Sequence, residues 1–500
     1  MSHPTALHRA LPDSPALAPW GFAAALATLG TTTLWQASIG INFSVWILCV
    51  VIALLTVMRD RFGVVSPPSL AASAWAVILA FGTAITTDSL RIGLLLLASL
   101  SLLAIALVSA NRWSLDSLQL RTALPAPFVA LGLVAASALR EAIGTARGTR
   151  SPAFASAVRS AIITIPLVTA LVFLLAEADP IFATARDGLM HGVPRELIAK
   201  SAFFALLLGV TLGAFGDVTR SARRNVAHTP SDSLEIGAIE RRVLMSALAS
   251  IVWLFVASSG LSLTHNPAAV TGSGITYAEY VHRGFAELSV AATIVIGAVL
   301  VTRRSWMRSD AWARGIAAAA ILGETGMIAI GFMRIVRYEQ AYGFTQQRLY
   351  AQAYIVVLAC MSVLLLGETL RRSTSSHFSY HSASAALLVF TVCVFCNTES
   401  WIVQHNIERY RETGQLDTSY ITYQMSDDAI PALVENIKWL HQPERATVRS
   451  FIRNKDIELQ RAADSKWYAW NYRARAGRRA AHMFRANDLS GPPLRESGNE

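Results

Sequence analysis

Repeated blocks of apolar residues are the feature of this sequence that most restricts its fold. Each block has about 17 to 22 residues, as in IGLLLLASLSLLAIALVSA at 92–110 and AIITIPLVTALVFLLAEA at 161–178, which is enough to cross a hydrocarbon core of about 30 Å as a helix. Of the 500 residues, 53% are hydrophobic and only 15% are charged, whereas about a quarter are charged in a soluble protein. The pattern predicts an all-α, polytopic membrane protein.

The blocks and the loop charges together predict about eleven membrane spans. The expected spans are residues 18–36, 41–58, 70–87, 92–110, 160–178, 201–217, 243–263, 282–302, 313–333, 349–368 and 383–402. A further apolar segment, residues 128–139, is short for a crossing. If it does not cross, most Lys and Arg of the short loops lie on the cytoplasmic side, which is the usual bias; if it crosses, the bias reverses. We therefore place 128–139 on the inner face.

This topology divides the chain into four expected parts. They are a cytoplasmic segment at 1–17, a membrane domain at 18–402, a small helical extramembrane module at 403–485 and a disordered tail at 486–500. After Ile402 the long apolar blocks stop and a mixed, amphipathic pattern begins. In the module we expect a turn at Gly414, a helix start near Pro431 and one helix over 446–481. The preferred topology puts the module on the outer face.

The first candidate site is a ladder of charges at the start of the span 282–302. Glu279, Arg283 and Glu287 are spaced by four residues, so they share a helix face and the arginine can pair with both carboxylates. One interpretation is a self-neutralised helix entrance whose long side chains reach the headgroups. The other is the lining of a polar cavity that opens to the outer face.

Glu324 is the second candidate, because it lies near the middle of the expected span 313–333, where a charged side chain is costly. Gly323 and Gly326 beside it would let another helix approach closely. We interpret the carboxyl either as a packing residue between helices or as the proton- or cation-coupling site of a carrier.

The loop that follows this span, residues 334–350, is rich in Arg and Tyr. Such residues often anchor helices at the membrane boundary. Because the loop and the charge ladder face the same side, the loop could also close a cavity over a small ligand. The remaining candidates of this outer polar cluster are Tyr277, Arg334, Arg337, Tyr342 and Arg348.

The sequence contains no pattern that predicts a cofactor site or a nucleic-acid-binding site. The four cysteines include one C-x-x-C pair, Cys393 and Cys396, in an apolar run without a second ligand pair, so we expect no metal site. The chain has no Gly-rich phosphate loop and no triad pattern, and we expect no cofactor. The net charge of +10 is explained by topology and by the anionic inner leaflet. The expected partner is therefore the lipid bilayer and not nucleic acid.

Four segments resemble successive signatures of a known family. They are TYAEYVHRGFAEL, RIVRYEQAYGFTQQRLY, NIERYRETGQLDTSYITYQMSDDAIPAL and WYAWN. They look like the bacterial multi-pass membrane proteins catalogued as domain of unknown function 4173, which is related to 4153, over about residues 160 to 475. The matching positions include Tyr277, Glu279, Arg283, Glu287, Arg334, Tyr338, Tyr342, Gly343, Thr345, Arg348, Asn406, Arg409, Asp417, Tyr420, Asp428, Pro431, Trp470 and Asn471. The resemblance implies the bacterial cytoplasmic (inner) membrane, but it supplies no activity, substrate or catalytic residue.

Three functions stay open on this basis. We expect first a non-catalytic envelope sensor or scaffold whose outer polar cluster packs against the module and meets other envelope proteins or a small ligand. The second hypothesis is a secondary transporter that uses Glu324. The third is an intramembrane enzyme acting on lipid-linked substrate with Glu279 or Glu287, since paired carboxylates can serve as acid and base.

Overall fold

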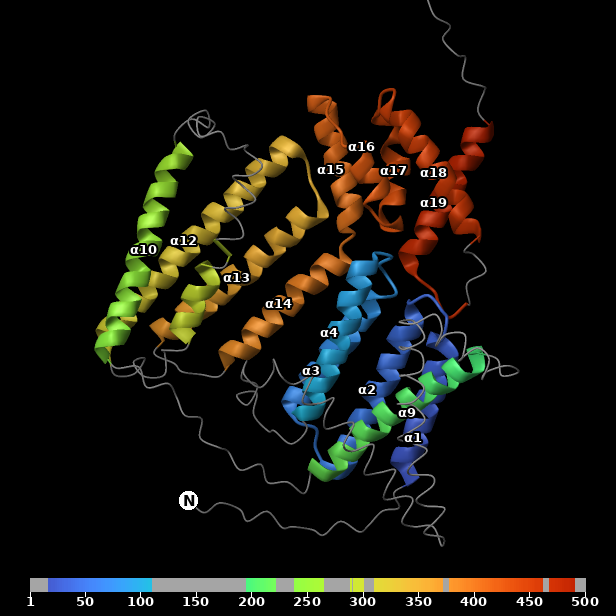
Figure 1. Ribbon diagram of the computed structural model, residues 1–500, viewed down its shortest axis with the longest axis horizontal. Coiled ribbons are helices and arrows are strands. Elements are labelled where there is room, and N and C mark those ends of the chain that lie inside the picture. Colours follow the sequence, from blue (N-terminus) through green and yellow to red (C-terminus); the bar gives the residue numbers. More distant parts are fainter. Residues whose placement is uncertain are drawn as a thin grey trace, which may run out of the picture.

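The computed structural model describes residues 17–109, 195–221, 238–264, 288–289, 291–300, 310–371, 377–461 and 467–490. Within these residues all regular secondary structure is helical (Figure 1). The prediction of an all-α protein is thus confirmed for the part of the chain that is described.

The helices form three groups in Figure 1. The amino-terminal group consists of α1 (Leu17–Leu34), α2 (Ile41–Phe62), α3 (Pro67–Gly82), α4 (Ser89–Val108) and α9 (Arg195–Ser221). The central group consists of α10 (Ala238–Thr264), α12 (Ala311–Tyr342), α13 (Gln346–Leu370) and α14 (His377–Phe395). The carboxy-terminal module consists of α15 (Thr398–Thr413), α16 (Thr418–Tyr423), α17 (Ile430–Asn436), α18 (Glu444–Arg461), α19 (Tyr472–Ser490) and the short 3-10 helices η4 (Asp427–Ala429) and η5 (Ile437–Trp439).

Several helices have the length and apolarity of membrane spans. Among the described residues α2, α4, α12 and α13 qualify, and a fifth span results if α14 and α15, which meet at a 65° bend, are counted together. Shorter apolar helices cover Gly21–Leu34, Pro67–Gly82, Ala199–Phe215, Arg242–Ala257 and Ala291–Leu300. These helices indicate a membrane protein, but the number of eleven spans is not confirmed. The expected span 160–178 and the segment 128–139 lie outside the described residues.

Small residues set the helix spacing in the membrane part. A Cβ added to Gly30 would lie 2.6 Å from the Leu207 side chain, and one added to Gly82 would lie 2.9 Å from the Val394 side chain. The backbone of α1 therefore packs directly against a side chain of α9, and the backbone of α3 against a side chain of α14. Gly323 likewise lies against Val252 and Trp253 of α10, at 3.0 to 3.2 Å from its ideal Cβ position. The expectation that another helix approaches at Gly323 is confirmed, and that helix is α10.

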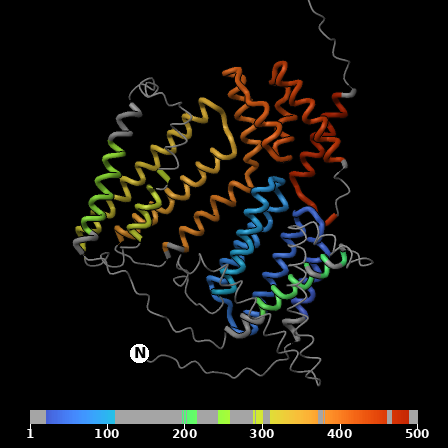
Figure 2. Tube along the Cα trace, viewed as in Figure 1, coloured from blue at the N-terminus to red at the C-terminus, as the bar shows by residue number. Residues whose placement is uncertain are grey.

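The module has an apolar core of its own. It is built from Val403, Ile407, Tyr410, Ile421, Ile430, Leu433, Leu440, Val448, Ile452, Leu459 and Ala481, together with smaller residues. These side chains come from α15 to α19, so the module is one packed unit. In Figure 2 the carboxy-terminal helices of this unit lie next to the amino-terminal helices α2 and α4.

Three predictions in this region differ from the structure. The helix expected over 383–402 is interrupted after Phe395, because Asn397 caps a new helix by accepting a hydrogen bond from Ser400 N. The single helix expected over 446–481 is two helices, since residues 467–471 are not helical and Asn471 caps α19 by accepting from Ala474 N. Helix α19 also continues through Ser490, so 486–490 are helical where we expected a disordered tail.

Candidate functional site

The module sits on the turns at one end of the membrane helices. The α1–α2 turn reaches it where Ile41 N donates to Trp470 O at 2.9 Å, and the α3–α4 turn where Tyr472 N donates to Ala84 O at 2.8 Å. Asn471 Nδ2 adds bonds to two more carbonyls of the α3–α4 turn. Backbone groups that would otherwise stay unpaired at helix ends are thus satisfied across this contact.

A buried cluster of charges, the junction, lies at the centre of the contact. It consists of Arg91 in the first turn of α4, Glu399 in the first turn of α15, Asp428 in η4 and Arg473 in α19. Arg91 Nη2 lies 3.2 Å from Glu399 Oε1, and Arg473 Nη1 lies 3.0 Å from Asp428 Oδ2. Their exposed fractions do not exceed 5%. Charges this deeply buried are tolerated only when they are paired and hydrogen-bonded.

The Asp428 carboxylate is the best satisfied member of the junction. Oδ1 accepts from Thr87 N at 2.9 Å and from its hydroxyl at 2.6 Å, and Oδ2 accepts from the Thr86 hydroxyl at 2.8 Å. Arg91 Nη1 lies 3.8 Å from Oδ2. Arg473, which binds Oδ2, also donates to the carbonyl of Phe395, the last residue of α14. The junction therefore joins α4, the end of α14 and the module in one hydrogen-bonded unit.

The link between α12 and α13, here called the elbow, is a second contact with the module. Asn406 of α15 accepts from Phe344 N at 2.7 Å and donates to Phe344 O at 2.8 Å. Arg409 donates to the carbonyls of Gln340 and Ala341 at the end of α12. Gly343 takes a φ of +83° at this point, a conformation that residues with a Cβ rarely adopt.

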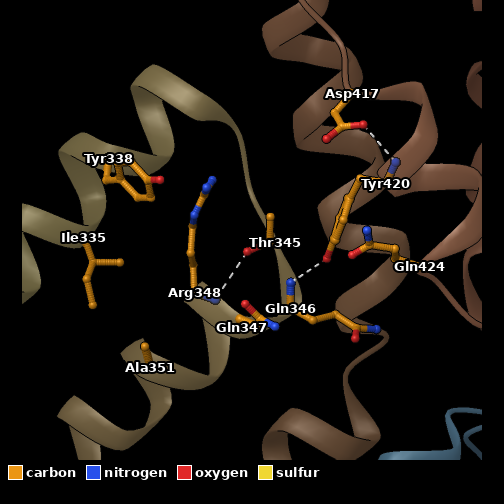
Figure 3. Close-up of a pocket in the computed structure, with 10 residues that line it drawn as sticks. All are labelled: Ile335, Tyr338, Thr345, Gln346, Gln347, Arg348, Ala351, Asp417, Tyr420 and Gln424. Atoms are coloured by element: carbon orange, nitrogen blue, oxygen red, sulfur yellow. Dashed lines mark hydrogen bonds between the residues drawn. The ribbon is translucent and has the colours of Figure 1, made fainter. Parts of the chain in front are cut away.

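A polar pocket of about 530 Å³ lies between the elbow and α16 of the module (Figure 3). Its lining residues are Ile335, Tyr338, Thr345, Gln346, Gln347, Arg348, Ala351, Asp417, Tyr420 and Gln424. Ligand pockets of small molecules have volumes of about 300 to 1,000 Å³. The pocket is built jointly by membrane helices and module, since Tyr420 and Gln424 face α13 across it.

Gln346 connects the pocket, which it lines, to the junction. Its backbone N donates to the Tyr420 hydroxyl at 2.7 Å, which forms part of the pocket wall. Its side-chain Nε2 donates to Glu399 Oε1 at 2.6 Å, the same oxygen that Arg91 binds. A change at the pocket wall therefore reaches the buried charges through one side chain.

The pocket lining contains one cation, Arg348, and one carboxylate, Asp417. The Arg348 side chain extends into the space between α12 and α16 (Figure 3). Its guanidinium lies 4.2 Å from the centre of the Tyr338 ring and donates to Gly343 O. Asp417 caps α16 by accepting from Tyr420 N at 2.9 Å. Burial raises the pKa of Tyr420, so its phenol stays protonated.

The structure separates the predicted site residues. Arg348 lines the pocket, whereas Arg334 lies with its guanidinium 5.9 Å from the centre of the Phe255 ring and Arg337 is exposed. Tyr342 is half-exposed and packs on Tyr338. Glu324 is fully buried in α12, and its carboxyl has no hydrogen-bond partner among the described residues. Tyr277, Glu279, Arg283 and Glu287 lie outside the described residues.

The junction was missed by the reasoning from sequence. Arg91 is not among the candidates named from the sequence, although an arginine three residues after the Asp88 cap of an apolar helix can indicate a buried partner. Asp428 and Asn471 entered through the family resemblance, without a role. Arg473 carried no signal, because it lies in an arginine-rich stretch that reads as a solvated helix face.

Metal binding has no candidate in the described ranges, where no three His, Cys, Asp or Glu side chains are grouped for it. In the junction the two arginines Arg91 and Arg473 balance the carboxylates instead.

Comparison with known proteins identifies a family without a known activity. No curated protein matches the chain, and no solved structure does. The family described as a domain of unknown function, DUF4153, matches residues 70–436. This match begins at α3, well before residue 160 where we expected the similarity to begin, and it includes Arg91, Glu399, Asp428 and the pocket. Since it covers more than half of the sequence, the chain belongs to the DUF4153 family.

Proposed function

We propose that this protein is a non-catalytic sensor of the bacterial cytoplasmic membrane, which binds a small polar ligand at the elbow pocket and transmits its presence to the module. The membrane helices hold the pocket at the boundary, and the module, placed outside by the loop charges, is the part that other envelope proteins would meet. A scaffold role follows from the same contacts if the pocket stays empty.

One observation carries the proposal, namely that Gln346 bonds the pocket wall and the junction at once. Glu399, its partner, also accepts from Ser426 N and from the Ser426 hydroxyl, both at 2.8 Å. Ser426 precedes η4 and caps it. The path from the pocket to η4 is thus three hydrogen-bonded residues long, namely Gln346, Glu399 and Ser426.

Ligand-dependent stabilisation and hydrogen exchange of the full-length protein in lipid nanodiscs test the proposal. A panel of amino acids, sugars, carboxylic acids and phosphate esters is screened for a raised unfolding temperature, since a ligand at 100 times its Kd stabilises by about 2.7 kcal/mol. For each ligand found, amide exchange is then followed in α16, in η4 and at the start of α4. A sensor shows changed exchange at η4 and α4, beyond the pocket itself.

The matched variants are Gln346→Met and Gln347→Met, two neighbours that both line the pocket. Only Gln346 is bonded to Glu399, so Gln346→Met should lose the ligand-induced change at η4, and Gln347→Met should keep it. Protection confined to the pocket in the unaltered protein, or no stabilising ligand in the panel, would speak against a sensor.

Glu324 supports a second candidate, the secondary transporter, because a carboxyl without a partner inside a membrane helix is a functional group by default. Both of its oxygens lack hydrogen bonds within the part of the chain that is described. Proteoliposomes with Glu324→Gln and with the unaltered protein separate the two candidates: a proton- or sodium-coupled flux that this substitution abolishes would favour transport over sensing.

A further inference from the structure

We propose that the elbow pocket recognises an anionic group, a carboxylate or a phosphate, which Arg348 binds. This inference rests on the proposed sensor function and names the ligand class of the same site. The two natural sources of such a group at a membrane boundary are a free small anion and the headgroup of an anionic lipid.

Arg348 is held in place for this task. It lies in the first turn of α13, stacks on Tyr338 and uses one guanidinium nitrogen to donate to Gly343 O. Among the described residues it has no carboxylate within ion-pair distance. A guanidinium carries five N–H groups in a rigid fork that matches carboxylate and phosphate oxygens. Apart from the bond to Gly343 O, its guanidinium N–H groups have no acceptor among the described residues, so they are available to a ligand in the pocket.

The neighbouring groups of the lining are also donors. The Tyr420 oxygen accepts from Gln346 N, which leaves its own proton for a ligand. The side chains of Gln347 and Gln424 add amide N–H groups. The pocket lies at the N-terminus of α13, where the helix dipole favours negative charge.

Negative charge near Arg348 comes from two groups, and neither neutralises it directly. Asp417 lines the pocket but is exposed, and it is engaged as the cap of α16. Glu339 lies behind the lining, buried in α12, where it accepts from Gln352. Ile335 and Ala351 supply the apolar part of the wall, so the pocket suits a small anion with an apolar portion.

Calorimetric titration of the full-length protein tests the inference. Nanodiscs of phosphatidylcholine alone are titrated with sodium phosphate and with sodium succinate, and sodium chloride serves as the ionic-strength control. Charge-assisted hydrogen bonds predict that Arg348→Gln weakens binding at least tenfold. Arg337→Gln removes an exposed arginine outside the lining, so it should bind like the unaltered protein.

Asp417→Asn gives the sharpest variant, because asparagine keeps the helix cap and removes the negative charge. An anionic ligand should bind severalfold more tightly to it, whereas a cationic ligand would bind more weakly.

Since Arg348 also supports the elbow, its loss could unfold the site. Gln424→Leu changes an exposed side chain of the lining and should weaken binding a few-fold while the unfolding temperature stays the same.

Nanodiscs with phosphatidylglycerol distinguish the two sources. If the headgroup is the ligand, phosphatidylglycerol raises the unfolding temperature of the unaltered protein but not of Arg348→Gln; if a free anion is the ligand, phosphate or succinate binds in phosphatidylcholine. Either result supports the inference. It is overturned if no anion binds in either bilayer, if Arg348→Gln binds equally well, or if Asp417→Asn binds more weakly.

The two proposals fail in different ways. An anion that binds through Arg348 without altered exchange at η4 leaves the site in place and refutes the sensor. A neutral or cationic ligand that changes exchange at η4 supports the sensor and refutes the anion site.

Discussion

Arg91 and Glu399 form an ion pair at 3.2 Å with exposed fractions of 1% and 0%, although one begins a membrane-spanning helix and the other begins the first helix of the module. A buried pair adds little net stability compared with apolar residues, but the loss of one partner leaves an uncompensated charge. The attachment of the module therefore depends on both side chains at once.

Replacing Arg91 by Gln should destabilise the full-length protein by about 3 to 5 kcal/mol, because Glu399 and Asp428 lose their shared cation. The unfolding temperature in nanodiscs and amide exchange in η4 measure the effect. Arg59→Gln, an exposed arginine in the last turn of α2, is the control and should change stability by less than about 0.5 kcal/mol. The double variant Arg91→Gln with Glu399→Gln should be less damaged than the sum of the two single ones; additive losses would mean that the pair is not coupled.

Asp428→Asn should also destabilise the protein by about 3 to 5 kcal/mol. Both Asp428 oxygens accept hydrogen bonds from surrounding donors, so an amide N–H group in place of one oxygen would face donors and find no acceptor. The adjacent Asp427→Asn is the matched control, since Asp427 is 23% exposed and its Lys455 partner lies at 3.5 Å. That pair should contribute at most about 1 kcal/mol. Thermal unfolding of both variants decides; equal losses would contradict the role of the Asp428 carboxylate in the junction.

Gly343→Ala should destabilise more than Gly414→Ala. Both glycines have positive φ. Gly414, with φ +69° and ψ 6°, lies in the left-handed helical region, where alanine costs about 1 to 2 kcal/mol. Gly343, with φ +83° and ψ 175°, lies in a region essentially restricted to glycine, where the cost is about 1 to 3 kcal/mol. At Gly343 the new Cβ would also lie 2.7 Å from Asn406 Oδ1, whereas nothing lies within 4 Å at Gly414. Denaturation midpoints of the two variants, and exchange at Phe344 N, test the difference. Equal midpoints would show that the elbow shifts without loss of its bonds to Asn406.

Glu324→Leu should leave the protein as stable as before, or raise its stability by about 1 to 3 kcal/mol, because a buried carboxyl without hydrogen bonds costs about that much. The unfolding temperature provides the measurement. A marked loss of stability would show that Glu324 has a polar partner, outside the described residues or in the bilayer, on which the fold depends.

The helical class, the close approach at Gly323 and the polar character of residues 334–350 could be predicted, because each follows from a local pattern. The loop expected over 334–350 is wrong, since these residues are helical except at 343–345. The apolar blocks, the small residues beside Glu324 and the Arg- and Tyr-rich segment can each be recognised within one continuous stretch of about twenty residues. The partners of Arg91 could not be predicted in this way, because Glu399 is 308 positions away and nothing near either residue marks the other.

The interruptions of the predicted helices could not be predicted from the sequence, for a related reason. No Pro or Gly marks the break after Phe395; it is fixed by Asn397, which caps α15 and donates to Asp428 O at 2.9 Å. The break before Tyr472 is fixed by Asn471, which bonds the α3–α4 turn. In both cases an asparagine without a distinctive sequence context interrupts the helix, because its side chain bonds a carbonyl that is distant in sequence.

The long sequence separation within the junction also dictates the order of events during synthesis. Arg91 enters the membrane with the fourth helix of the chain, while Glu399, Asp428 and Arg473 have not yet been made. Until they are, its guanidinium must remain at the water boundary with Asp88, 3.0 Å away, as its nearest carboxylate. The junction can therefore close only on a nearly finished polypeptide, and a chain that ends before Glu399 leaves Arg91 without its partners in the module.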